Sequence, residues 1–278
     1  WFINYFKNCN QKSMMHTAKN MHQILSLSND AYEEIFQEID TTGLVEKRGI
    51  IYIWTNKNLK SRKLEIKVRE ELGIEQKLLT QKEVLNLEPN LQPVFDAGVI
   101  YESAMHARDP HGILKKIFKL YLERGGKFVQ TNVKSLEQIN INETAIRSEN
   151  EEYKFEKTVV ASGAFSKSLT DQLGENIPLD TERGYHVHFK GKDHLISRPV
   201  IFLDRGFGMT PMNQGLRAVG TVELGGLKNP PSKKRIDYII KCAKELLPDL
   251  GNHEDEWLGF RPTLPDFLPI LGPSLKNK

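Results

Sequence analysis

The sequence predicts an α/β protein whose C-terminal half forms an antiparallel sheet. Apolar residues recur at helical spacing in residues 1–40, and a sharply delimited helix at 110–124 lies next to strand-forming segments. Beyond Pro178, runs rich in β-branched and aromatic residues are separated by short turns that contain Gly, Asn or Asp. Such short turns join antiparallel strands, because parallel strands need long crossover connections.

The N-terminal third predicts helices and one strand. Residues 1–40 predict two helices, with Ser28-Asn29-Asp30 as a cap between them. Thr80-Gln81-Lys82-Glu83 is a capping-box pattern at the start of a short helix that Pro89 ends. The other elements expected here are a strand at 49–54 and a helix at 57–72, which ends at Gly73.

The middle of the chain predicts half of an α/β unit. Asp109 is the N-cap of a helix that has Pro110 at its first position and continues to Gly125-Gly126. We expect strands after it at 127–131, 133–139, 144–148 and 154–161. The helix would then connect two strand regions at the spacing of a crossover.

The C-terminal part predicts alternating strands and one further helix. The helix covers about 235–247 and ends at Pro248. The expected strands are 185–189, 200–203, 207–212, 216–223 and 257–260.

Composition excludes several classes of protein. Of 278 residues, 39% are apolar and 27% charged, and no apolar run reaches the ~18 residues of a membrane-spanning helix. The net charge is only +3 and both signs are interspersed, which argues against nucleic acid as a partner; the run at 233–235 fits a solvated first helical turn. Cys9 and Cys242 are far apart, which fits a reducing compartment and excludes a cysteine-rich metal site.

Two segments contain residues suited to binding. The strand at 158–160 enters the small-residue turn Ala161-Ser162-Gly163-Ala164, where a backbone can approach a bulky cofactor, although an ordinary strand-to-helix turn has the same pattern. Arg261 follows an apolar strand and precedes Pro262, so it is either a binding residue or a member of a surface ion pair.

These segments resemble the flavin-dependent amine oxidoreductases of the D-amino-acid oxidase superfamily, and most closely the bacterial D-amino-acid dehydrogenase small subunits. The matching motifs occur in family order and extend over nearly the whole chain. They are Val159 to Ser166, Pro178-Leu179 with Arg183-Gly184-Tyr185, Leu216 to Glu223, and Gly259 to Gly272.

The resemblance implies a two-domain flavoprotein. Residues 105–170 and 261–278 would form part of the FAD-binding domain, residues 171–260 the substrate-binding domain, and residues 1–104 elements shared with the latter. Family members begin with a G-x-G-x-x-G turn for the FAD pyrophosphate, which this sequence lacks. We therefore expect a fragment that lacks both ends of the FAD-binding domain, and we expect it not to retain FAD by itself.

The resemblance also implies site residues. Arg261 would pair with the substrate α-carboxylate, and Arg183 and Tyr185 would lie near the flavin ring, with a structural strand role as the alternative for these two. The FAD contacts would come from Val133, which could equally be strand core, and from Ala161, Ser162, Gly163 and Ala164. No metal site is expected, because His106, His186 and His188 have no carboxylate or Cys partner at metal-ligand spacing.

The implied function is FAD-dependent oxidative deamination of a D-amino acid to a 2-oxo acid and ammonia, with electrons passed to a respiratory quinone. The implied location is the cytoplasm, and the alternative is peripheral attachment to the inner membrane. One alternative is a glycine- or sarcosine-type oxidase that uses O2. Another is a non-catalytic binding subunit that lacks FAD.

Overall fold

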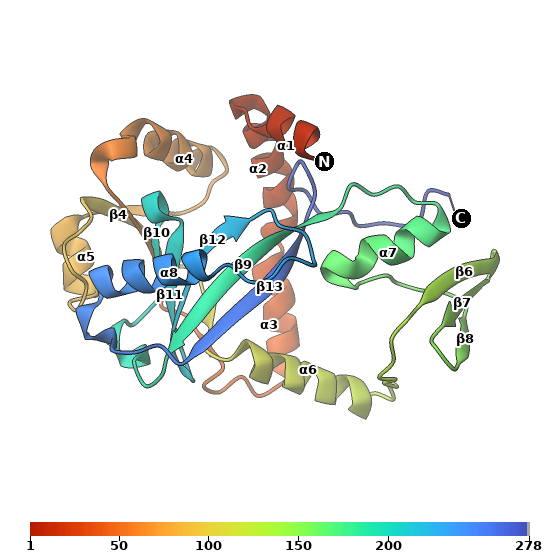
Figure 1. Cartoon of the computed structure of the whole chain (residues 1–278). Helices are drawn as coiled ribbons and strands as arrows, with labels where there is room; N and C mark the ends of the chain where they lie inside the picture. Colours follow the sequence, from red (N-terminus) through yellow and green to blue (C-terminus); the bar gives the residue numbers. More distant parts are fainter. Residues whose placement is uncertain (277–278) are drawn as a thin grey trace.

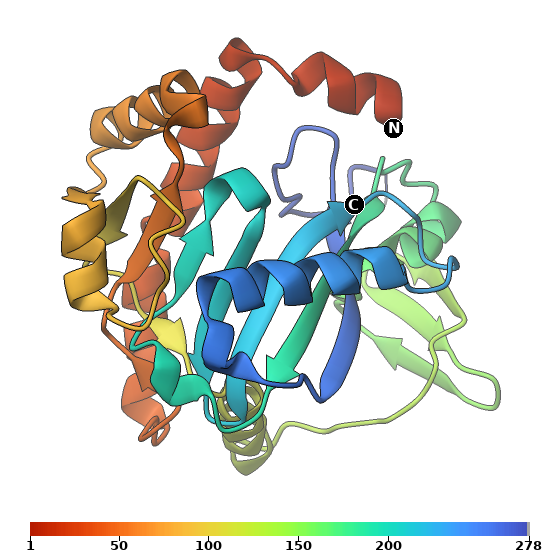
Figure 2. The ribbon, with the colours of Figure 1, turned by 60° about the vertical axis from the view of Figure 1, so that its left-hand side comes forward.

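The fold centres on an eight-stranded sheet, seen in a computed structural model that describes residues 1–276 (Figures 1 and 2). Its strand order is β13-β9-β12-β11-β10-β2-β4-β3, and every neighbouring pair is antiparallel except β10 and β2. The antiparallel sheet predicted for the C-terminal half is thus confirmed. The strands are β2 (Ile50–Trp54), β3 (Lys77–Thr80), β4 (Ala97–Tyr101), β9 (Asp180–Phe189), β10 (Val200–Phe202), β11 (Phe207–Met212), β12 (Gly215–Glu223) and β13 (Asp255–Thr263).

Helix α8 (Lys233–Leu246) lies across one face of this sheet and closes the main core (Figure 2). Its buried residues Ile236, Ile239, Ala243 and Leu246 recur at helical spacing, so a single stripe of the helix meets the sheet. The helix predicted at 235–247 is confirmed. Most of the core lies between α8 and the sheet, because the largest cluster of buried side chains includes residues from both.

Helices α1 (Phe2–Asn8), α2 (Gln11–Leu25) and α3 (Ser28–Glu38) run behind the opposite face of the sheet in Figure 1. Two helices were expected in this region. A third forms because Asn10 caps α2, where its Oδ1 accepts a 3.0 Å hydrogen bond from the Ser13 amide. None of the residues of these three helices is buried.

Two short helices flank the β2–β4 side of the sheet. Helix α4 (Leu59–Glu71) packs Ile66 against a small cluster that includes Trp54. Helix α5 (Gln81–Leu87) begins with the predicted capping box, in which the Thr80 amide donates to the Glu83 carboxylate at 2.8 Å. Both predicted helices are confirmed.

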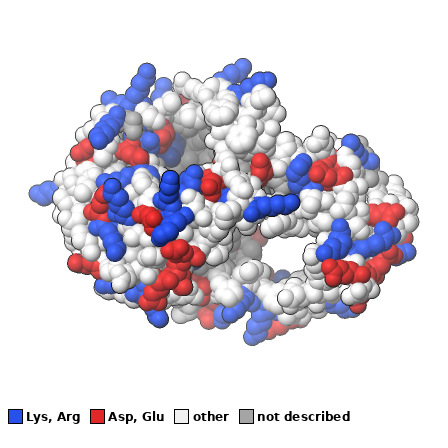
Figure 3. All heavy atoms as spheres, viewed as in Figure 1, with Lys and Arg blue, Asp and Glu red and all other residues white. Residues whose placement is uncertain are grey.

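A separate lobe projects beside the edge strand β13 (Figure 1). Helix α6 (Pro110–Glu123) begins at Asp109, whose Oδ1 accepts from the Gly112 amide at 2.9 Å as predicted, and α7 (Ser166–Thr170) lies in the lobe itself. Space-filling atoms show an opening between the lobe and the main body, and charges of both signs are mixed on this face (Figure 3). The lobe sheet contains β6 (Ser135–Asn140), β7 (Glu143–Arg147) and β8 (Glu152–Phe155), while β1 (Val45–Glu46) pairs with β5 (His106–Ala107) in the main body.

Two of the predicted strands differ from the structure. Residues 127–134 and 156–162 belong to no sheet, and β8 already ends at Phe155. A strand needs a neighbour for its backbone hydrogen bonds, and no strand within residues 1–276 pairs with either segment. Val159 accordingly remains 87% exposed. The predicted crossover is not formed, because β6, β7 and β8 pair antiparallel with one another.

Candidate functional site

The two faces of β9 have different environments. Arg183, Tyr185, Val187 and Phe189 alternate along the strand and are each fully buried on the face that α8 covers. Because successive side chains of a strand point to opposite faces, Glu182, Gly184, His186 and His188 point the other way. We call this second face, shared by β13, β9, β12 and β11, the open face.

Arg261 lies on the open face of β13, opposite Glu182 in the register. Its guanidinium extends over Gly184, because an ideal Cβ built on that glycine would lie 3.1 Å from Nη2 and 3.3 Å from Cζ of Arg261. A residue with a side chain at 184 would displace the guanidinium. Within residues 1–276, no carboxylate lies within ion-pair distance of Arg261, so the alternative of a surface ion pair finds no support.

A second glycine completes the floor of this region. Gly259 is the register partner of Gly184, and the indole of Trp257 leans over it, so that an added Cβ would lie 1.9 Å from the ring. Trp257 also stacks on His186, with ring centroids 4.7 Å apart and planes at 19°. This glycine pair and Trp257 are not among the residues predicted from the sequence. The spacing Trp-x-Gly-x-Arg, which puts three residues on one face of a strand, could have indicated Trp257 and Gly259, but not Gly184.

The predicted small-residue turn lies beside the edge strand β13. Phe165, the last residue of the 3-10 helix η2 (Gly163–Phe165), contacts Phe260 of β13 edge to face, with centroids 6.0 Å apart. Ala164 is buried, whereas Ala161, Ser162 and Gly163 are exposed. Phe260 alternates with Arg261 along β13, so the turn contacts this strand on the face opposite to the Arg261 side chain.

The geometry of this turn fits a bulky cofactor. Gly163 has φ +56°, and a Cβ added there would meet no described atom within 4 Å. The Oγ1 of Thr158, just before the turn, is buried without a hydrogen-bond partner among the described residues. An open turn of small residues beside an unpartnered polar atom leaves both space and hydrogen-bonding capacity for a group such as FAD. Ala161, Ser162, Gly163 and Ala164 are the residues that would hold it there.

Arg183 and Tyr185 do not lie with Arg261. Both point to the covered face, where Glu223 of β12 accepts a 2.5 Å hydrogen bond from the Tyr185 hydroxyl and lies 3.4 Å from Nε of Arg183. The Pro230 carbonyl accepts from Nη2 of Arg183 at 2.9 Å. Burial, followed by the hydrogen bond to Glu223, raises the pKa of Tyr185. These contacts fit the structural strand role and separate both residues from the open face.

Val133 lies in the unpaired segment just before β6 and is half-buried. Behind it, the side chain of Gln172 links the lobe sheet to the turn after α7, because its Oε1 accepts from the Leu136 amide at 3.2 Å and its Nε2 donates to the Lys134 carbonyl at 3.1 Å. The link fixes the start of the lobe sheet to the turn at 171–173. A contact between Val133 and adenine remains a prediction.

The three histidines occupy two places. His106 is buried in β5, and neither ring nitrogen has a hydrogen-bond partner among the described residues; burial lowers its pKa. On the open face, burial followed by the charge of Arg217 lowers the pKa of His188, and the same two causes lower that of His186 to about 4. Within residues 1–276, no group of three or more His, Cys, Asp or Glu side chains is placed to hold a metal ion.

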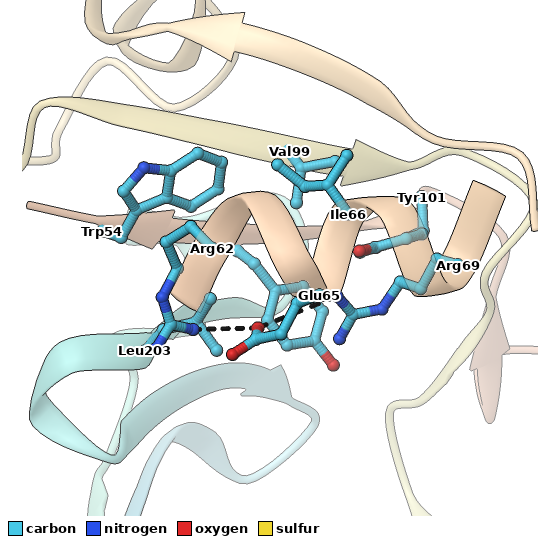
Figure 4. Close-up of a pocket in the computed structure, with 9 residues that line it drawn as sticks. Trp54, Arg62, Glu65, Ile66, Arg69, Val99, Tyr101 and Leu203 are labelled. Carbon is cyan, nitrogen blue, oxygen red and sulfur yellow. Dashed lines mark hydrogen bonds and ion pairs between the residues drawn. The ribbon is translucent and has the colours of Figure 1, made fainter. Parts of the chain in front are cut away.

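Two hollows among the described residues lie away from the predicted site residues. One, of about 10 Å³, lies under α4 among Trp54, Tyr101 and the ion-paired Arg62 and Glu65 (Figure 4). It has room for about one water molecule, so it is a small packing gap and not a binding site for a larger ligand. The other, of about 530 Å³, lies between α3 and α6.

Residues 9–278 match the family model described as FAD dependent oxidoreductase, and the chain belongs to this family, whose cofactor is FAD. None of the helices in residues 1–276 is both long and apolar enough to cross a membrane.

Two curated relatives match over almost the whole chain. A D-amino-acid oxidase of Bradyrhizobium diazoefficiens is 28% identical, over 98% of this chain and 66% of the relative. A D-amino acid dehydrogenase of Vibrio atlanticus is 27% identical, over 100% of this chain and 69% of the relative. The chain thus spans about two thirds of the length of these relatives.

Solved structures share the fold. Glycine oxidase from Geobacillus kaustophilus superposes with a TM-score of 0.77 at 19% identity, over 91% of this chain and 69% of the other. L-proline dehydrogenase from P. horikoshii superposes with a TM-score of 0.76 at 19% identity, over 94% and 70%. The α/β fold expected of an FAD-dependent oxidoreductase is confirmed.

Proposed function

We propose that this chain provides the substrate-binding side, and part of the FAD-binding side, of an enzyme that oxidises a D-amino acid to an imino acid, which water converts to a 2-oxo acid and ammonia. The observation that carries the proposal is the guanidinium of Arg261, which lies over Gly184 on the open face of β13, the strand whose Phe260 contacts Phe165 after the small-residue turn. The names of the two curated relatives support a D-amino acid as the substrate.

In this proposal Arg261 binds and orients the substrate. Its planar fork donates two parallel hydrogen bonds to the α-carboxylate, which fixes the direction of the Cα–H bond. Bound FAD supplies the hydride acceptor for that bond. Gly184 contributes by having no side chain, so that the guanidinium can lie flat against the strand. Positioning provides most of the rate enhancement, and no side-chain acid–base pair is required.

For the electron acceptor we propose a respiratory quinone instead of O2, and the name of the Vibrio atlanticus relative, a dehydrogenase and not an oxidase, supports an acceptor other than O2. Direct transfer to O2 is the second candidate, because the 28% identical relative is named an oxidase. A glycine-type substrate with O2 is a further variant, which the name of the glycine oxidase neighbour favours. Peroxide formation in air separates the quinone from the O2 variants.

The experiment uses the intact protein loaded with FAD. Under anaerobic conditions, D-alanine should bleach the flavin absorbance near its visible maximum, while L-alanine should not, and ammonia should appear in equal amount. A quinone analogue should then restore the absorbance. If D-alanine, L-alanine, glycine and a panel of other D-amino acids all leave the flavin oxidised, the function is wrong and the non-catalytic subunit takes its place.

A further inference from the structure

The open face carries a second cation besides Arg261. Arg217 of β12 is half-buried and lies opposite His188 of β9, and its Nε donates a 2.9 Å hydrogen bond to Nε2 of that histidine. Among the described residues, no Asp or Glu side chain forms an ion pair with Arg217. Its remaining four N–H donors are therefore available to a ligand.

The neighbours of Arg217 do not neutralise its charge. His188 accepts the Arg217 hydrogen bond at Nε2, so its ring is neutral and carries its proton on Nδ1. His186 is also neutral at physiological pH, because burial lowers its pKa to about 4. Asp255 of β13 lies opposite His188 in the register, but it is exposed and makes no ion pair with Arg217. A partly buried cation without a counter-charge favours the binding of an anion.

Arg217 and Arg261 lie at a distance that suits one small ligand. The Arg261 guanidinium is over Gly184, and His188 is four residues further along the same face, which corresponds to about 13 Å of strand. A five-carbon dicarboxylate, with carbon–carbon bonds of ~1.5 Å and a contact of ~2.8 Å to a guanidinium at each end, spans about 11–13 Å. The aromatic pair Trp257 and His186 lies between the two cations and can cover the methylene groups.

We propose that Arg217, held by His188, binds a carboxylate at the end of the substrate side chain, so that the site prefers dicarboxylic amino acids such as D-glutamate. This inference rests on the proposed function for the role of Arg261. It adds a specificity-determining residue and a substrate class that neither the family nor the relatives' names specify.

The first experiment measures binding without turnover. The affinity of the intact protein for glutarate and for pentanoate, which has the same length but a single carboxylate, is determined by titration calorimetry. We expect glutarate to bind about tenfold more tightly or better, and Arg217→Gln to abolish that difference. Arg147→Gln is the control, because Arg147 forms ion pairs only within the lobe sheet. Equal affinities in the wild type, or an unchanged preference in a folded Arg217→Gln variant, would overturn the inference.

The second experiment separates the inference from the proposed function. Anaerobic flavin reduction is compared for D-glutamate and its neutral isostere D-glutamine. We expect Arg217→Gln to raise KM for D-glutamate about tenfold or more, with D-glutamine little affected. If both substrates reduce the flavin equally well and respond equally to the substitution, the function stands and the specificity inference fails. If no amino acid reduces the flavin, the function fails, and glutarate binding still decides whether the anion site exists.

Discussion

At the scale of single residues, the site depends on two glycines, which have no side chain. Gly184 and Gly259 face each other across β9 and β13, and their missing side chains give room to the Arg261 guanidinium and the Trp257 indole. The sequence singles out Arg261, because a lone arginine between an apolar strand and Pro262 matches the family motif. It does not reveal the floor beneath it, since that floor depends on the register between two strands about 75 residues apart.

Arg261→Lys in the intact enzyme should raise KM for D-amino acids while FAD content stays normal. Lysine keeps the charge but replaces a planar fork with a point donor, so the bidentate contact and the orientation of Cα are lost. The loss of one charge-assisted hydrogen bond costs about 1.5–3 kcal/mol, a tenfold to hundredfold fall in kcat/KM, and Arg261→Met should cost more. Steady-state kinetics with Arg147→Lys as the control checks this. Near-normal kcat/KM in both Arg261 variants would move the carboxylate anchor to Arg217.

Gly163→Leu should reduce the FAD content of the intact protein. Leucine would fill the open space at the turn, and its Cβ is strained at φ +56°. Gly191→Leu is the control for backbone strain. Gly191 has a similar φ of +64° and equally open surroundings on a turn after β9, away from the proposed cofactor site. The ratio of flavin to protein absorbance should fall only for the Gly163 variant. A comparable fall in both variants would point to strain instead of a blocked cofactor.

At the scale of elements, β9 joins the core and the site in one strand. Its buried series from Arg183 to Phe189 packs toward α8, and the alternate series from Glu182 to His188 forms the open face. This alternation is visible in the sequence and could have shown that Arg183 and Tyr185 face away from Gly184. The family motif alone does not show this, because a motif match identifies residues but not the face of the strand to which each side chain points.

Tyr185→Phe should destabilise the fold and leave substrate binding nearly unchanged. The variant removes the hydroxyl that donates to Glu223 and accepts from the Ser232 amide, which costs about 1–3 kcal/mol. Glu149→Gln is the control, because Glu149 forms an exposed pair with Lys134 in the lobe. Urea unfolding and KM for D-alanine are measured on all three proteins. A large rise in KM with unaltered stability would restore the catalytic role that the resemblance implies for Tyr185.

The local elements were predictable where their signals are local. The capping box at Thr80, the N-cap Asp109 and the end of α8 before Pro248 all depend on a few neighbouring residues, and all were found in the structure. The strand expected at 127–131 was not, and the one expected at 154–161 formed only at residues 154–155, although the residues of both favour strands. Strand formation requires a partner, and composition cannot indicate whether one lies alongside.

At the scale of the whole molecule, one sheet combines strands from distant parts of the chain. The parallel pairing of β10 with β2 joins residues 50–101 to residues 180–263. This pairing links segments about 150 residues apart. Local sequence patterns cannot predict a pairing over such a separation. The domain boundaries expected from the sequence remain a prediction, as do the FAD contacts of Val133 and of residues 161–164.

The stability of the molecule should fall as the pH is lowered from about 6.5 to 4, and His186 should account for part of the loss. Burial first, then the positive charge of Arg217, lower its pKa from 6.5 to about 4, and its stacking neighbour Trp257 does not titrate. Between these two pH values the unfolded chain binds a proton that the folded chain does not. The free energy of unfolding therefore decreases as the pH falls.

His186→Gln should flatten this dependence, since glutamine has no proton to gain. The contribution of His186 is about 1–2 kcal/mol, because its partly exposed ring keeps some hydration. Urea unfolding at pH 7 and pH 4.5 is compared for the wild type, His186→Gln and the control His16→Gln, which alters an exposed histidine on α2. The loss on acidification should be smaller by that amount in His186→Gln alone. If the wild type and His186→Gln lose the same free energy, the ring is protonated equally easily in the folded and unfolded chains, and the open face is more hydrated than its packing indicates.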